Sequence, residues 1–307
     1  MQGVVLKAAG ALFSVKDPVS GQMYECKVRG KLRLKELKTT HVAVVGDRVE
    51  FQPSGENEGL IESILERKNY LIRKSTNLSK EAHVIAANVD LALLVVCLSR
   101  PQTNLEFVDR FLATAEAYKI PVCIVINKID EYNDTEQDVL EGWKQLYESI
   151  PYPVYEISAR TGLGMEKLRS DIAHKMVLLS GNSGVGKSTI INVWADQTKA
   201  RTGAISDYHH KGKHTTTFSE IFELGEDTYL IDTPGIKGFG LVDIAEEELC
   251  HYFPDLFAFS SGCKFYNCTH QHEPGCAVVQ ALEDGKIHPS RYYNYLKILI
   301  GDEGKYR

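Results

Sequence analysis

The 307-residue sequence has no apolar run long enough to cross a membrane. The longest run, Leu91–Leu98, is far shorter than the roughly 20 residues that a spanning helix needs. The amino terminus lacks a basic leader and a small-residue cleavage site, so we expect no signal peptide. No internal repeat or low-complexity tract is visible. These absences predict a protein that makes no contact with membranes.

An excess of basic residues is also missing. The 35 Lys and Arg residues are outnumbered by 41 Asp and Glu residues, which gives a formal net charge of −6. This balance argues mildly against a nucleic-acid partner, but a whole-chain sum can hide local basic stripes. Hydrophobic residues at 43% and charged residues at 25% are ordinary for a globular protein. The length favours two or three domains over a single core.

The cysteines do not form the even, regularly spaced set of a disulfide framework. Three of the seven, Cys263, Cys268 and Cys276, crowd into one short segment with histidines, while Cys97 and Cys123 sit in apolar, strand-like runs. This distribution favours a metal site plus buried thiols in a reducing compartment. We therefore expect a cytoplasmic protein.

The first ~70 residues have the pattern of a small all-β domain. Short runs that alternate apolar and polar residues are separated by turn signals such as Asp17-Pro18 and Gly46-Asp47. About five strands at this spacing predict a small closed barrel such as an OB-fold. The expected strands contain Val4–Leu6, Leu12–Val15, Met23–Arg29, Arg48–Phe51 and Leu60–Ile64. The polar and basic segment Arg73–Lys80 is predicted to be a linker.

From Asn88 onward, buried strands alternate with amphipathic helices, which predicts a doubly wound parallel sheet. The expected order is strand Leu91–Leu98, helix Leu105–Tyr118, strand Val122–Ile126, a helix, strand Val154–Ile157, helix Met165–Ala173 and strand Met176–Leu179. A hairpin over Phe218–Leu224 and Thr228–Ile231 follows, then a helical, cysteine-rich end with a helix near Tyr292–Ile300. We divide the chain into domains at residues 1–70, 71–240 and 241–307.

A phosphate-binding loop is predicted at Gly181–Ser188, which fits G-x-x-x-x-G-K-[ST] in full between a strand and a helix. Its backbone N–H groups can surround phosphate oxygens, aided by the positive end of the following helix. Lys187 is expected to reach the β- and γ-phosphates, and Ser188 to bind Mg²⁺. The expected nucleotide contacts are Gly181, Asn182, Ser183, Gly184, Val185, Gly186, Lys187, Ser188 and Thr189.

A second phosphate-side motif, Asp232-Thr233-Pro234-Gly235, follows a strand. Asp232 can hold the Mg²⁺ shell through water, and the Gly235 N–H can reach the γ-phosphate. Such a turn is common by itself, but downstream of a phosphate-binding loop it is a strong signal.

The base-reading motif is Asn127-Lys128-Ile129-Asp130, at the carboxyl end of a strand, where ligands bind in such sheets. Asp130 can accept two hydrogen bonds from guanine, and adenine lacks that pair of donors. Lys128 is expected to lie along the base and Asn127 to brace the neighbouring loops. The Ser158–Ala159 backbone can donate to the guanine oxygen. Together with the phosphate-binding loop, this motif predicts GTP as the nucleotide.

The order of these motifs is permuted, because Asn127–Asp130 and Ser158–Ala159 precede the phosphate-binding loop instead of following it. With Ile85–Asp90 and His214–Thr217 as further matching phrases, the chain resembles the circularly permuted GTPases of the RsgA (YjeQ/YloQ) family. The resemblance covers essentially the whole chain. It implies an OB-fold barrel, a permuted P-loop GTPase domain and a helical zinc-binding domain. It also implies a role in maturation of the small ribosomal subunit.

Hydrolysis is expected to involve the loop before the hairpin, with Thr216 binding Mg²⁺ and sensing the γ-phosphate. Many GTPases orient water with a glutamine after the Asp-x-x-Gly glycine, but Ile236 stands there. We therefore hypothesise that His214 orients the water, with His209 and His210 as rivals. The expected catalytic set is His214, Lys187 and Thr216, and turnover should be slow without a partner.

A structural zinc site is predicted at Cys263, Cys268, His270 and Cys276, because three thiolates and an imidazole leave no open position. His272 could replace His270 as the fourth ligand, and the spacing in the family that the chain resembles favours His270.

A basic stripe, in which apolar residues separate the cations, predicts an RNA contact on the barrel. Its residues are Lys27, Arg29, Lys31, Arg33 and Lys35, and the barrels of the family that the chain resembles contact ribosomal RNA. Cationic residues elsewhere (Lys264, Arg73 and Lys74) could add contacts.

The sequence thus favours a monomeric GTPase that binds the small ribosomal subunit and its rRNA, and that uses GTP hydrolysis for late maturation or its own release. The alternative is a nucleotide-gated RNA-binding adaptor in which hydrolysis is incidental. An ATP-dependent kinase is disfavoured by the base-reading motif.

Overall fold

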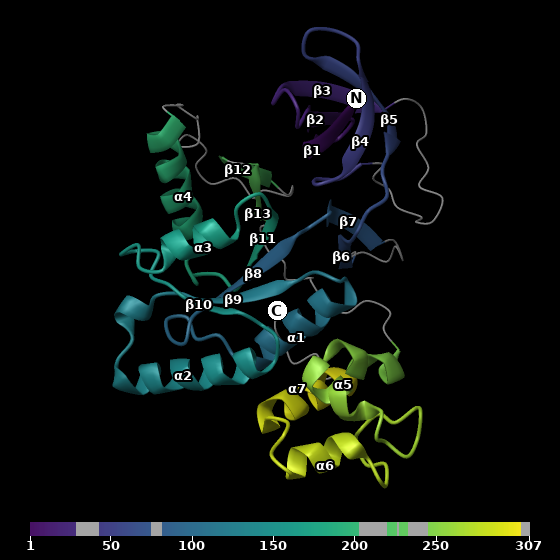
Figure 1. The fold of residues 1–307 in the computed structure, drawn as a ribbon, viewed down its shortest axis with the longest axis vertical. Helices are drawn as coiled ribbons and strands as arrows, with labels where there is room; N and C mark the ends of the chain where they lie inside the picture. Colours follow the sequence, from purple (N-terminus) through teal and green to yellow (C-terminus); the bar gives the residue numbers. More distant parts are fainter. Residues whose placement is uncertain (29–42, 75–81, 203–219, 226, 233–244, 302–307) are drawn as a thin grey trace.

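The computed structural model describes residues 1–28, 43–74, 82–202, 220–225, 227–232 and 245–301 (Figure 1). An amino-terminal barrel lies at one end of the molecule, a sheet with helices on both faces lies in the middle, and a small helical region lies at the other end. No helix in the described ranges combines the length and the apolar character that a membrane span requires.

The amino-terminal strands close into the expected barrel. Strands β1 (Gln2–Ala9), β2 (Leu12–Lys16), β3 (Met23–Val28), β4 (Arg48–Pro53) and β5 (Glu58–Ile64) pair in the order β1-β2-β3-β5-β4. All pairs are antiparallel except β3 with β5, which is parallel. Residues alternate between exposed and buried along the strands, as expected when one face of each strand lines a core. That core includes Val5, Val15, Cys26, Val49, Phe51 and Ile61.

The predicted linker over Arg73–Lys80 is wrong at its start. Strand β6 (Tyr70–Lys74) includes Arg73 and Lys74 and pairs with β7 (Ala82–Ala87), while residues 75–81 lie outside the described part. Polar composition misled the prediction, because a two-stranded antiparallel ribbon can expose a face to solvent.

Buried polar contacts hold the barrel against the rest of the chain. The Arg67 guanidinium donates to both carboxylate oxygens of Asp47 at 2.7 and 2.8 Å. The side chain of Asn88, just after β7, donates to the Gly46 carbonyl at 2.9 Å. Gly46 has φ +86°, and a Cβ there would stand 2.1 Å from the Ala87 oxygen. Only glycine therefore allows the two backbones to approach so closely.

The central sheet has six described strands in the order β10-β9-β8-β11-β13-β12. They are β8 (Leu91–Val96), β9 (Val122–Ile126), β10 (Val154–Glu156), β11 (Met176–Ser180), β12 (Glu220–Gly225) and β13 (Thr228–Asp232). All neighbours are parallel except the β12–β13 hairpin. In this order, β8, β9, β10 and β11 lie together although long helical segments separate them in sequence.

Helices cover both faces of this sheet, which confirms the doubly wound prediction. Strand β8 is buried along its whole length. Its residues Ala92, Leu94 and Val96 pack in the core that includes residues of α1 (Leu105–Ala117) and α2 (Asp134–Ser149). The alternate residues of β8 pack in a core that includes residues of α3 (Met165–Asp171) and α4 (Lys187–Thr202).

The carboxy-terminal region contains η3 (Glu246–Tyr252), α5 (Pro254–Ser260), α6 (Ala277–Glu283) and α7 (Pro289–Leu299). It packs against α1 through a buried charge network. The Arg291 guanidinium lies 2.7 Å from an Asp109 carboxylate oxygen, and both side chains are fully buried. Asn294 and Tyr147 also donate to that carboxylate, at 2.6 and 2.9 Å. Burial alone would lower the pKa of Arg291, but the carboxylates of Asp109 and Asp255 raise it, so the cation is maintained.

Candidate functional site

The phosphate-binding loop connects β11 to α4 and needs its glycines for two reasons. Gly181, Gly184 and Gly186 have φ of +142°, +84° and +101°, which side chains other than hydrogen rarely allow. In addition, a Cβ on Gly181 would stand 2.1 Å from the Val95 oxygen. A Cβ on Gly186 would stand 2.3 Å from the amide nitrogen of Asn127. The loop is thus packed closely on the ends of β8 and β9.

Asn127 connects three segments that are distant in sequence. Its side-chain N–H donates to the Val185 carbonyl at 2.8 Å, and its side-chain oxygen accepts the Ala159 N–H at 3.0 Å. The same Val185 carbonyl accepts the Cys97 thiol at 3.5 Å. The base-reading motif, the Ser158–Ala159 turn and the phosphate-binding loop therefore meet at one edge of the sheet.

The base-reading turn begins at Lys128, which has φ +67°, and continues into the short helix η1 (Ile129–Glu131). The Asp130 carboxylate bonds with the Ser158 hydroxyl and lies 2.5 Å from the Arg160 guanidinium. The Ser158 hydrogen bond, with Arg160 adding to it, lowers the pKa of Asp130 below its usual value. At neutral pH the carboxylate is therefore ionised, which is the form that accepts two hydrogen bonds from a base.

The phosphate side is positioned by β11 and β13. The Lys187 amine donates to the Gly181 and Asn182 carbonyls at 2.7 and 2.8 Å, so it lies over the loop. Ser188 and Thr189 are exposed in the first turn of α4. Asp232 ends β13 and pairs through its backbone with Leu179, two residues before the loop begins. This register brings the end of β13 next to the phosphate-binding loop.

Several predicted site residues lie outside the described residues. These are His214, Thr216, Gly235, Arg29, Lys31, Arg33 and Lys35, together with the alternatives His209 and His210 and the residue Ile236. Lys27 is described and is exposed on β3. The roles assigned to all of these residues stay predictions.

Sequence reasoning missed Cys97, Arg160 and Tyr132, which support the pocket from behind or beside it. Arg160 directly follows Ser158–Ala159, so its place next to Asp130 could have been expected from the motif. Cys97 was recognised as a buried thiol, but its hydrogen bond to Val185 has no signal in sequence because it crosses 88 residues.

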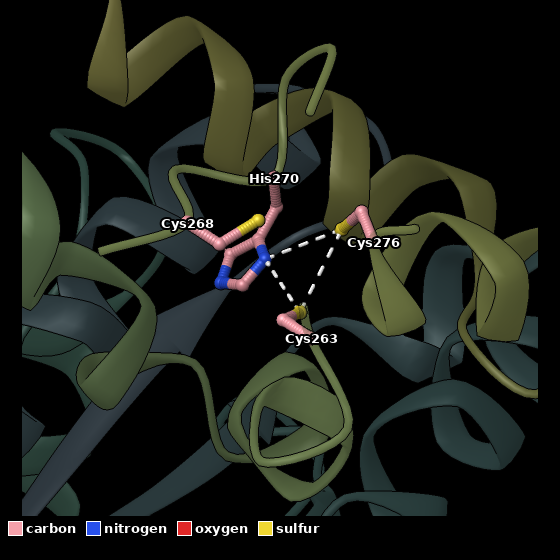
Figure 2. Close-up of side chains that lie close together, drawn as sticks. All are labelled: Cys263, Cys268, His270 and Cys276. Atoms are coloured by element: carbon pink, nitrogen blue, oxygen red, sulfur yellow. Dashed lines mark hydrogen bonds between the residues drawn. The ribbon is translucent and has the colours of Figure 1, made fainter. Parts of the chain in front are cut away.

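A separate cluster in the carboxy-terminal region could hold a metal ion. Ligand atoms of Cys263, Cys268, His270 and Cys276 all lie within 4.8 Å of one another, and Figure 2 shows the side chains turned toward a common centre. The Cys263 sulfur lies 3.9 Å from the Cys276 sulfur, and the His270 Nδ1 atom lies 3.6 and 3.4 Å from these two sulfurs. A tetrahedral zinc site has ligand–ligand separations of about 3.5–3.8 Å. The donor set and its spacing thus fit zinc.

The segment that carries His270 is held by neighbouring side chains. His270 has φ +61°, and its carbonyl accepts the Tyr292 hydroxyl of α7 at 2.7 Å. The Glu273 carboxylate accepts the backbone N–H groups of Thr269, Gln271 and His272. Burial lowers the pKa of His270, which favours the neutral imidazole that a metal needs. His272, the alternative ligand, is exposed and lies outside the cluster.

Comparison with known protein families places the chain. The RsgA N-terminal domain matches residues 2–61, and the RsgA GTPase domain matches residues 64–242. The chain belongs to the RsgA GTPase family. The predicted resemblance is therefore confirmed, and with it the prediction of an enzyme that hydrolyses GTP.

Relatives and solved structures match this family member over nearly its whole length. The small ribosomal subunit biogenesis GTPase RsgA 2 of Bacteroides thetaiotaomicron is 51% identical, with 100% of this chain and 99% of the relative covered. The Porphyromonas gingivalis RsgA is 48% identical, with 97% and 96% covered. YjeQ from Thermotoga maritima has a TM-score of 0.81 and 34% identity, with 99% of each chain covered. YloQ, a circularly permuted GTPase, has a TM-score of 0.77 and 31% identity, with 100% and 96% covered.

Proposed function

We propose that this RsgA-family GTPase acts on the small ribosomal subunit and uses GTP hydrolysis to drive late maturation or its own release. The observation that carries the proposal is the closure of three sequence-distant motifs around Asn127, which builds one pocket with a base-reading end and a phosphate end. The relatives' names, which specify small-subunit biogenesis, supply the partner. The domain division at residues 70 and 240 is part of the same proposal.

In the pocket, Asp130 is assigned to the guanine N1–H and 2-amino groups. Lys128 is assigned to the face of the base and the Ala159 N–H to the guanine oxygen. The loop Gly181–Thr189 surrounds the phosphates, with the Lys187 amine moving from its carbonyl partners to phosphate oxygens. Ser188, Thr216 and Asp232 would hold Mg²⁺, which supplies positive charge against the phosphates. Gly235 completes the γ-phosphate contacts.

For hydrolysis, we assign the orientation of the attacking water to His214 because Ile236, at the position of the usual glutamine, has no polar group. Lys187 offsets the charge that develops on the leaving phosphate oxygens. Turnover is then slow until the ribosomal partner orders the catalytic loop.

The remaining assignments concern the two ends of the chain. Zinc is the metal proposed for the cysteine and histidine cluster, with a folding role. The stripe that begins at Lys27 is proposed to contact rRNA phosphates, with a binding strength that falls steeply as salt is added. We assign the protein to the cytoplasm as a monomer.

The test is GTP turnover by the full-length chain with and without purified small subunits, and with large subunits as a control. We expect strong stimulation by small subunits only, and loss of that stimulation in His214→Ala. If the nucleotide state changes binding to small subunits while turnover stays at its basal rate, the adaptor alternative replaces this function. Stimulation that is unchanged in His214→Ala removes only the histidine assignment.

A further inference from the structure

The side chain of Tyr132 lies between two neighbouring strands at the guanine end of the sheet. Its hydroxyl donates to the Asn127 carbonyl at 2.6 Å and accepts the Leu98 N–H at 3.0 Å. Asn127 directly follows β9, and Leu98 comes two residues after the end of β8. One phenol oxygen therefore joins the carboxyl ends of these two strands.

The register of the sheet shows what this hydroxyl replaces. The N–H of Ala92 donates to the Pro121 carbonyl, and the pairing of β8 with β9 continues in step to Val96 and Ile126. In a parallel pair such bonds recur every second residue, so the next members of the series bring Leu98 N–H to the Asn127 carbonyl. In place of that direct bond, the Tyr132 hydroxyl is inserted between the two groups. The strands are thus spread apart by one oxygen atom where the base-reading turn begins.

The consequence is a fixed orientation of the Asn127 peptide group. Asn127 directs its side chain to Val185 and Ala159, and the next residue, Lys128, has φ +67° and starts the turn that carries Asp130. Burial raises the pKa of the Tyr132 phenol, so it stays protonated and remains a donor. The turn is also tied to the loop after β8, because the Lys128 amine donates to the Arg100 carbonyl at 2.7 Å.

We propose that Tyr132 is a positioning residue for guanine recognition, in that its hydroxyl spaces the ends of β8 and β9 and thereby places the Asp130 carboxylate for two-point contact with the base. The inference rests on the proposed nucleotide site and extends it to a residue that touches no nucleotide. It assigns to Tyr132 an effect on the choice between bases, in addition to any effect on stability.

The test compares Tyr132→Phe with the parent full-length chain in equilibrium binding of GDP, inosine diphosphate and ADP. Inosine diphosphate lacks the 2-amino group, so it makes only one of the two bonds to Asp130. Because Y132F leaves the Leu98 N–H and the Asn127 carbonyl without their partner, we expect GDP affinity to fall about tenfold. Affinity for inosine diphosphate should fall much less, so the preference for GDP over inosine diphosphate narrows.

The matched control is Tyr152→Phe. This hydroxyl donates to the Glu116 carboxylate at 2.9 Å, and Tyr152 precedes β10, at the opposite edge of the sheet. Tyr152→Phe should lower the melting temperature without changing the ratio of GDP to inosine diphosphate affinity. If Tyr132→Phe behaves in the same way, or weakens both nucleotides equally, the positioning role is overturned. A parent chain that fails to prefer GDP over ADP overturns the proposed site itself, and the positioning role with it.

Discussion

The metal cluster and the nucleotide pocket are built in opposite ways. The four candidate metal ligands come from one segment, residues 263–276, between short helices. The pocket takes Asn127, Ala159 and Val185 from the ends of different strands and joins them by hydrogen bonds across 32 and 58 residues. A local cluster of thiols and imidazole depends on an ion for its shape, because nothing else offsets the crowding of its polar atoms. The pocket depends on a sheet whose strands are buried on both faces.

Metal removal should therefore separate the two sites, and we expect it to have the largest effect. Structural zinc sites contribute roughly 10 kcal/mol to local folding. Chelation, or Cys276→Ser, should remove hydrogen-exchange protection over residues 263–276 while GDP binding is largely retained. Hydrogen exchange measured by mass spectrometry, with GDP titrations on the same samples, checks this. A parallel loss of GDP affinity would show that the pocket is not independent of the cluster.

Arg291→Leu tests whether the carboxy-terminal region needs more than its metal. The substitution leaves the fully buried Asp109 carboxylate without its cation, and breaking a buried pair costs about 3–5 kcal/mol. Chemical denaturation should show a loss of that size. The control is Lys286→Ala, which removes the exposed pair with Asp284. An exposed pair contributes at most about 1 kcal/mol, so equal losses in the two variants would contradict the role of burial.

Asn127→Ala tests the pocket side of the comparison. It removes two buried hydrogen bonds, to Val185 and from Ala159. We expect the free energy of GDP binding to weaken by about 2 kcal/mol, because buried groups are left unpaired. Isothermal titration calorimetry measures this. Asn133→Ala removes the capping box of α2, which lies nearby but outside the pocket, and should lower stability without changing GDP affinity.

Arg160→Ala should have the smallest effect. Arg160 is paired with Asp130, but its side chain is 69% exposed. Exposed ion pairs contribute about 1 kcal/mol or less and are screened by salt. The free energies of unfolding and of GDP binding should therefore change by less than that at physiological ionic strength. A larger loss would mean that surface charge, and not buried hydrogen bonding, holds Asp130 in place.

The same contrast explains how much the sequence could predict. The barrel, the doubly wound sheet and the four metal ligands were predictable, because strand periodicity and ligand spacing are local patterns. The choice of His270 over His272 rested on resemblance, and the structure supports it by burying one ring and exposing the other. The β6–β7 ribbon was missed because its residues Arg73 and Lys74 are polar. Tyr132 and the Asp109–Arg291 pair depend on contacts that only the folded chain brings together.

Asp109 and Arg291 are 182 residues apart in sequence. Because a nascent chain emerges from its amino terminus, α1 is synthesised long before α7. During that interval, Tyr147 is the only one of the three groups described above that can donate to the Asp109 carboxylate, and water must solvate the rest of it. The surface of α1 that the final helices cover stays wet until residue 294 has emerged. Synthesis of the last helix thus completes the interior around one of the first.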